Sequence, residues 1–274
     1  VVVVINPVSG KSLTENFTGT VRFDQVQALH TRIPSTLPAG KATTFSVRVT
    51  NTGIAPMLVQ TDARRNGSQT LQLAPQFAGS TFSLPLNVEE LSDVPAYLVP
   101  PDTKQVAMTA SSTVPAQVEL SSPGGGIDVF GDLAAAQGGS TISTATVSET
   151  KDQVGPGIWF TYVQEIGPYG DGGAPAGSTT ISTTATTKPF DPAVASSTGD
   201  PYLPAVDPTN DGGTPLVIAP GASGTITVTI TPTGKAGTKV NGVLHLVTTP
   251  IGVASSFNTT GEVLANLPYS YTIG

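Results

Sequence analysis

Apolar and polar residues alternate with a period of two along much of this chain, and this alternation restricts the chain to strand-based folds. In the segment 43–50, Phe45, Val47 and Val49 fall on one side and polar residues fall on the other. The segment 225–231 repeats the scheme, with Ile and Val on one side and Thr on the other. Successive side chains of a β-strand point to opposite faces, so each segment predicts a strand with one buried face and one hydrated face.

Glycine and proline punctuate these segments. The chain has 30 Gly and 24 Pro, which favour turns and oppose long helices. No helical crossovers separate the expected strands, so neighbouring strands are expected to be antiparallel. The expected fold is all-β, built as tandem antiparallel β-sandwich modules of the immunoglobulin or fibronectin III-like type.

An internal match supports a repeated unit. Residues 37–53 align without gaps to residues 218–234, and Gly40 coincides with Gly221. Both segments read as a turn, a long strand and a second turn, and Gly suits such turns because it tolerates positive φ. The match indicates a duplicated module.

Turn positions and repeated segments divide the chain into three expected modules. Residues 1–80 form a fibronectin III-like sandwich, residues 81–171 a sandwich like that of pre-peptidase C-terminal domains, and residues 172–274 a second fibronectin III-like sandwich. The opening residues 1–10 have the form of the segment 158–170, a strand that runs into a Pro/Gly turn. Residues 1–5 are interpreted as the last strand of a module whose remainder is missing.

Charge and composition exclude several classes of partner. The net charge is −7 with 11% charged residues and no basic stripe, so no nucleic-acid partner is expected. No segment approaches the roughly 20 apolar residues that span a bilayer, so no membrane span is expected. There is no Cys for a disulfide or a thiolate site. Few charges with many Ser, Thr and Gly favour a secreted or cell-surface, extracellular protein, held here as a mature or trimmed piece.

Motifs for catalysis are missing. The sequence has no G-x-S-x-G elbow, H-E-x-x-H pair or Walker loop. Its two histidines, His30 and His245, are interpreted as structural or solvated residues. Glu89 and Glu90 are adjacent, so on a strand they would point to opposite faces and would not act together. This chain is therefore expected not to be an enzyme.

Calcium is the most plausible ion for the chain, because hard oxygen ligands on a Gly-rich loop suit it. The segment DPTNDGG offers Asp207, Asn210 and Asp211 as ligands. Asp, Asn and Gly also make ordinary turns, so a plain turn is the alternative. No other cofactor is expected.

Aromatic residues offer a candidate ligand platform. Trp159, Tyr162 and Tyr169 lie close in sequence and would surround a carbohydrate-type site if their rings were exposed. Trp159 stands between Ile158 and Phe160, and the alternative is that it belongs to a sandwich core.

Several segments resemble a known family. Residues 189–200 and 215–248 are similar to the C-terminal accessory region of secreted actinobacterial subtilisin-like serine peptidases, a bacterial subtilase C-terminal region. Residues 97–110, 127–130 and 156–160 resemble pre-peptidase C-terminal domains in layout. In that family the catalytic Asp, His and Ser lie in a separate domain, and their flanking motifs are absent here.

The resemblance implies a non-catalytic accessory region that acts as a structural spacer or docks protein substrate. Its partners would be an upstream catalytic domain of the same protein or a protein substrate. The alternative is a cell-surface adhesin-like or carbohydrate-binding array with no enzyme attached.

Overall fold

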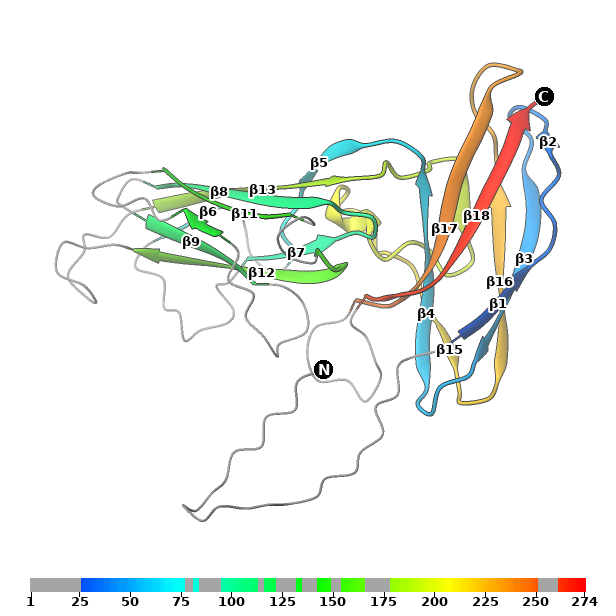
Figure 1. The fold of residues 1–274 in the computed structure, drawn as a ribbon, viewed down its shortest axis with the longest axis horizontal. Helices are drawn as coiled ribbons and strands as arrows, with labels where there is room; N and C mark the ends of the chain where they lie inside the picture. Colours follow the sequence, from blue (N-terminus) through cyan, green and yellow to red (C-terminus); the bar gives the residue numbers. More distant parts are fainter. Residues whose placement is uncertain are drawn as a thin grey trace, which may run out of the picture.

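The structure is a computed structural model that describes residues 26–76, 81–83, 95–112, 116–121, 132–134, 142–148, 154–165, 178–250 and 261–274. Within these residues the chain is all-β, as predicted, and its helical content is one short 3₁₀ turn, η2 (Leu203–Ala205). The expected strand at residues 1–5 lies outside the described residues. The strands form two bodies, each made of two sheets (Figure 1).

One body, here called the split unit, is built from both ends of the described chain. Its sheets have the orders β1-β3-β16-β14 and β15-β4-β17-β18-β2. The strands are β1 (Val26–His30), β2 (Thr36–Leu37), β3 (Thr43–Asn51), β4 (Met57–Arg65), β14 (Val194–Ser196), β15 (Leu216–Ile218), β16 (Ser223–Ile230), β17 (Lys239–Thr248) and β18 (Val263–Ile273).

The other body, the inserted unit, comes from the middle of the chain. Its larger sheet has the order β10-β11-β8-β13-β5, with β6 also pairing β13, and its smaller sheet the order β7-β12-β9. The strands are β5 (Gln69–Leu73), β6 (Thr81–Ser83), β7 (Ala96–Val99), β8 (Gln105–Ser112), β9 (Ala116–Ser121), β10 (Asp132–Ala134), β11 (Ile142–Ser148), β12 (Gly157–Glu165) and β13 (Ser178–Thr187).

Alternation explains the core of the split unit. Phe45, Val47 and Val49 on β3 are buried, whereas the residues between them are more exposed. They meet apolar residues of the facing sheet, including Met57 and Leu244, in a single core. Burial of a Val or Leu side chain stabilises a fold by about 1.5–3 kcal/mol, so this stripe is enough to hold the two sheets face to face.

The core of the inserted unit forms in the same way. Val106 and Met108 on β8 and Ile181 on β13 face Trp159 and Tyr97 of the smaller sheet. All five side chains are at least 97% buried. The unit therefore has an apolar core of its own.

The repeated segments lie side by side in one sheet. β3 and β16 pair antiparallel, with Thr43 opposite Ile230 and Thr50 opposite Ser223. Gly40 and Gly221 adopt positive φ of 66° and 73°, so the two turns are alike. The match therefore relates two strands of one core rather than two separate sandwiches.

This pairing differs from the expected tandem division at residues 1–80, 81–171 and 172–274. Strands from the first and third ranges share both sheets of the split unit. β5, placed in the first module, instead pairs β13 of the inserted unit. Local patterns located the strands, but strand partners depend on contacts distant in sequence, which the alternation does not encode.

The sheet that contains β4 and β17 is covered on both faces. One face packs on β3 and β16, and the other faces the inserted unit (Figure 1). Every residue of β4 except Arg65 is buried, although the strand contains the polar residues Gln60, Thr61, Asp62 and Arg64. Val247 of β17 belongs to the core of the inserted unit. The polar side chains of this outer face are thus enclosed at the junction of the two units.

Candidate functional site

The junction collects buried polar groups from the outer face of β4 and β17. Gln60, Asp62 and Arg64 on β4 and His245 on β17 are all at most 3% exposed. Register places His245 opposite Asp62. Buried polar groups need partners, so the contacts of these four side chains define what the junction can do.

Arg64 and Asp62 form a buried ion pair. The Arg64 Nε atom lies 2.8 Å from Asp62 Oδ1 and 2.9 Å from Oδ2, and Nη1 donates to the Lys188 carbonyl at 3.1 Å. The guanidinium lies 3.5 Å from the centroid of the Phe190 ring, which adds a cation–π contact. Arg64 therefore ties β4 to the segment that leaves the inserted unit.

A second carboxyl group lies beside this pair. Burial, and then the charge of Asp62, raise the pKa of Asp200 well above its usual value. The raised pKa favours the neutral form of Asp200, whose side chain hydrogen-bonds Asp62. The Arg64 guanidinium is thus enclosed with two carboxyl groups, those of Asp62 and Asp200.

Asp191 forms another polar contact at the end of the split-unit core. Tyr269 Oη donates to Asp191 Oδ2 at 2.5 Å, and Arg65 Nε lies 2.8 Å from Asp191 Oδ1. Burial, followed by the charge of Asp191, raises the pKa of Tyr269. The Tyr269 hydroxyl therefore keeps its proton and acts as a hydrogen-bond donor at neutral pH.

His245 joins the two units. Its Nε2 lies 3.0 Å from Asp102 Oδ2 in the loop before β8, and its Nδ1 lies 2.6 Å from Asn266 Oδ1 on β18. Lys188 Nζ also lies 2.8 Å from Asp102 Oδ2. Hydrogen bonding from His245 is the first cause that lowers the pKa of Asp102, and Lys188 adds to it. Both ring nitrogens are occupied by carboxylate or amide oxygens, which confirms a satisfied strand residue.

Asp102 occupies an unusual backbone position. Its φ is +59°, and no other non-glycine residue among those described has a positive φ. Such a conformation costs about 1–3 kcal/mol and persists only where its surroundings fix it. The contacts with His245 and Lys188 fix Asp102 and so hold the inserted unit in place.

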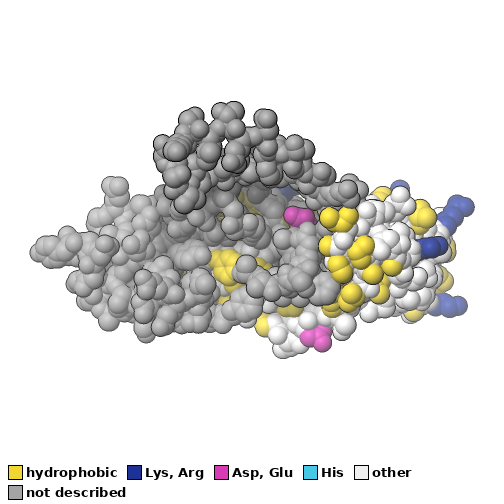
Figure 2. Space-filling model, turned by 90° about the horizontal axis from the view of Figure 1, so that it is seen from below, with side chains coloured by type: hydrophobic (Ala, Val, Ile, Leu, Met, Phe, Trp, Pro, Cys, Tyr) yellow, Lys and Arg dark blue, Asp and Glu magenta, His cyan; other side chains and the backbone are white. Residues whose placement is uncertain are grey.

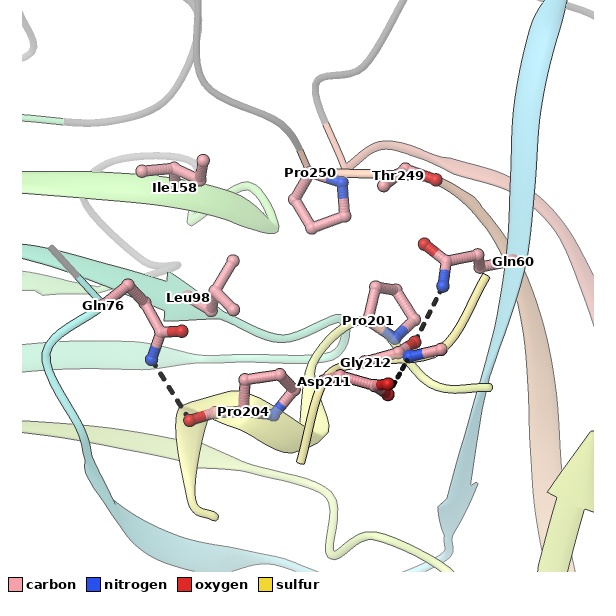
Figure 3. A pocket seen from close by; sticks show the side chains of 11 residues that line it. Gln60, Gln76, Leu98, Ile158, Pro201, Pro204, Asp211, Gly212, Thr249 and Pro250 are labelled. Atoms are coloured by element: carbon pink, nitrogen blue, oxygen red, sulfur yellow. Dashed lines mark hydrogen bonds between the residues drawn. The ribbon is translucent and has the colours of Figure 1, made fainter. Parts of the chain in front are cut away.

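A cavity of about 280 Å³ opens between the two units (Figure 3). The split unit and the segment 201–213 contribute one side, and Leu98 and Ile158 of the inserted unit contribute another. The residues that line the cavity are Gln60, Gln76, Leu98, Ile158, Pro201, Pro204, Asp211, Gly212, Gly213, Thr249 and Pro250. This cavity is the candidate ligand site of the described residues.

The candidate calcium ligands lie on a turn beside this cavity. Asp207 Oδ1 accepts from the backbone and hydroxyl of Thr209, Asn210 Oδ1 from Gly212 N, and Asp211 Oδ1 from Gly213 N. These bonds are those of Asx turns, in which the side chain caps the backbone two residues further on. The described residues contain no group of three or more His, Asp or Glu that could hold a metal ion. Calcium binding stays a prediction.

Of the three aromatic candidates for a ligand platform, the structure describes the side chain of Trp159. Trp159 is 1% exposed, and its indole N–H donates to the Gly155 carbonyl at 2.9 Å, so it is a core residue. Tyr162 lies on β12 with its backbone opposite Glu119. Tyr169 falls outside the described residues.

Sequence reasoning missed Gln60, Thr249 and the prolines of the cavity. Gln60 begins a run of three polar residues in its strand, and such a run normally indicates contact with water. The signal that was available is the stretch PYLPAVDPTNDGG at 201–213, whose three prolines and turn residues are unusual for a simple connection between strands.

Comparisons with known proteins give little further guidance. No family model and no curated protein matches this sequence. A solved structure titled "AvmM Catalyzes Macrocyclization in Alchivemycin A Biosynthesis" is similar at 12% identity and a TM-score of 0.29, over 92% of this chain and 89% of that one. A score at this level carries no argument about fold or activity. Within the described residues, no helix is long and apolar enough to cross a membrane.

Proposed function

We propose that this chain is a non-catalytic, rigid structural part of a secreted protein, of the kind that subtilisin-like serine peptidases carry as accessory regions. It would act as a spacer or as a docking module for protein substrate. The observation that carries the proposal is the junction, where the contact of His245 with Asp102 and a shared core link the two units.

The double connection between the units supports rigidity. The chain enters the inserted unit after Arg65 and returns before Pro189, and Arg65 N donates to the Pro189 carbonyl at 2.9 Å. His245 Nε2 lies 3.0 Å from Asp102 Oδ2, and Tyr202 Oη, in the core of the inserted unit, donates to Gly261 O at 2.6 Å. The chain crosses between the units twice, and polar contacts surround both crossings. Such a connection resists hinge motion better than one flexible linker does.

The finer description of the fold belongs to the same proposal. Each unit would be an antiparallel sandwich related to immunoglobulin or fibronectin III modules, with one sandwich inserted into the other. Support comes from the two-sheet cores and the antiparallel pairing of the long strands.

Orientation and activity test this proposal separately. Residual dipolar couplings of the purified chain should fit a single alignment tensor for both units. Casein should remain intact after prolonged incubation with repurified protein. Two tensors would contradict the rigid spacer, and hydrolysis that survives repurification would contradict the non-catalytic role.

The coding sequence upstream of Val1 tests whether the parent protein is a peptidase. Subtilase motifs there would support the peptidase, and further β-modules would favour the alternative.

A second candidate function is a cell-surface adhesin-like or carbohydrate-binding array. The outer face of the larger sheet in the inserted unit favours it. Register places Thr144, Thr109 and Ser182 in one row across β11, β8 and β13. The outward residues of these strands are Ser, Thr, Gln and Ala rather than charged groups. Hydroxyl rows suit a neutral, polyhydroxylated polymer.

Glycan arrays test the second candidate. Wild-type protein should bind a neutral polysaccharide, and Ser182→Lys should abolish binding by placing a charge in the row. Thr225→Lys, on an exposed strand position of the split unit, is the matched control and should bind normally. Equal binding by both variants would exclude this face.

A further inference from the structure

The orientation of the Gln60 amide is fixed inside the junction. Its Nε2 donates to the Thr198 carbonyl at 3.0 Å and to the Gly212 carbonyl at 2.8 Å. Both carbonyls can only accept, so the amide nitrogen must face them and the oxygen must face away. The Gln60 oxygen is turned toward the cavity in Figure 3.

This oxygen has no hydrogen-bond partner in the structure, although it is buried. The Thr249 hydroxyl, which also belongs to the lining, is likewise buried and unpartnered. An unsatisfied buried polar group costs about 1–3 kcal/mol, so a native protein rarely keeps one without a reason. A ligand that donates a hydrogen bond would remove this penalty.

The rest of the lining limits what that donor can be. Leu98, Ile158 and three prolines give apolar walls, and the one charged residue of the described lining is Asp211. Gly213 N donates to Asp211 Oδ1, which fixes the carboxylate at the rim. No Lys or Arg is among the residues that line the cavity. On the face that Figure 2 shows, the basic side chains gather mainly at the end of the split unit far from the inserted unit.

Size restricts the ligand further. At about 280 Å³ the cavity lies below the usual range for drug-sized ligands. It therefore fits a group of side-chain size. An apolar stem with a donor head that carries a positive charge matches the walls, the fixed acceptor and the carboxylate together.

We propose that the junction cavity binds an alkylammonium group, such as the side chain of a lysine presented by a partner protein. Methylene groups contact the prolines, Leu98 and Ile158. The ammonium donates to the Gln60 oxygen after a small local adjustment, and Asp211 attracts its charge. The proposal concerns the cavity alone and holds whether or not a peptidase accompanies the chain.

Three probes of similar length test the site: n-butylammonium, n-butanol and butyrate. Each is titrated at pH 7 into the full chain while ¹⁵N NMR follows the Gln60 side-chain amide and the backbone of 211–213. Butylammonium should give saturable shifts there and bind about tenfold more tightly than butyrate, with butanol between them. Equal affinities, or no saturable shift at these residues, would overturn the proposal.

A matched pair of variants separates charge from structure. Asp211→Asn keeps the side-chain oxygen that caps Gly213 but removes the charge, so butylammonium affinity should fall about tenfold while butanol affinity stays the same. Asp207→Asn makes the same change on the same turn outside the lining and should have no effect. A similar loss of butylammonium affinity in both variants would show that a long-range electrostatic field acts on the ligand, and would contradict a specific site at Asp211. Thermal melts confirm that both variants fold.

Discussion

At the scale of single residues, the junction shows how a polar side chain becomes structural once both faces of its sheet are covered. Arg64 and His245 are polar residues of two strands, yet both are at most 3% exposed. Each is enclosed with oxygen acceptors from a different part of the chain. Their contribution depends on partners that must stay ionised or correctly oriented, which makes these residues sensitive to charge and pH.

Asp102 predicts a specific pH dependence. Its pKa is lowered in the folded state, first by His245 and then by Lys188, so the folded protein binds fewer protons here than the unfolded chain. The stabilisation is present above the unfolded pKa of about 3.9 and is lost as the pH falls below it. At pH 7, Asp102→Asn should lower the free energy of unfolding by about 1 kcal/mol, since the carboxylate is partly solvated.

Urea unfolding at a series of pH values measures this effect. The difference between wild type and Asp102→Asn should shrink as the pH falls from 5 toward 3. Asn tolerates positive φ nearly as well as Asp, so the variant isolates the charge. A difference that stays constant over this range would contradict the assignment.

Removal of the Arg64 guanidinium should cost much stability, because its buried partner Asp62 remains. Arg64→Leu leaves the Asp62 and Asp200 carboxyl groups enclosed without a cation, and the free energy of unfolding should fall by about 3–5 kcal/mol. Arg48→Leu, at an exposed position of β3, should change it by less than about 0.5 kcal/mol. Chemical unfolding compares the variants. A double variant that also carries Asp62→Asn should lose less than the two single losses added together.

At the scale of elements, strand positions follow from the sequence and strand partners do not. Alternation predicts strands at 43–50 and 225–231, and the structure has β3 and β16 there with nearly the same bounds. The short β1 and β15 were missed, because too few residues show the pattern. The cavity was missed for a similar reason, since Gln60 acquires its environment from segments up to 152 residues away.

Gly242 tests how closely β17 and β18 pack. It lies opposite Tyr269, and an added Cβ would overlap the Tyr269 ring and lie 2.5 Å from the Arg64 carbonyl oxygen. Gly242→Ala should therefore destabilise the protein by about 1–3 kcal/mol. Gly155→Ala is the control, because nothing lies within 4 Å of its added Cβ. Thermal melts measure both, and equal melting temperatures would contradict the packing.

At the scale of the whole molecule, the insertion makes the two units depend on one another. Val247 of β17 packs in the core of the inserted unit, and Tyr202 and Ala205 also join that core. Without the inserted unit, the outer face of β4 and β17 would expose the apolar Val247 and polar side chains such as His245, which the inserted unit covers. The two units are therefore expected to fold as one cooperative system.

Coincident unfolding transitions test this dependence. Fluorescence of Trp159 reports the inserted unit, and amide hydrogen exchange of β3 and β16 reports the split unit. Both probes should give the same free energy of unfolding, within the error of the extrapolation. A Trp159 transition that precedes exchange at β3 would show two independent units.

The insertion also decides how the molecule carries mechanical load. Pulling on residues 26 and 274 acts on β1 and β18, which both belong to the split unit. Close to the C-terminal end, Thr36 and Leu37 of β2 pair in parallel with Thr272 and Ile273 of β18. The inserted unit joins at two neighbouring points, Arg65 and Pro189, which a hydrogen bond holds together. Tension applied between residues 26 and 274 therefore does not act on the inserted unit until the split unit unfolds. The cavity between the two units is expected to keep its shape until then.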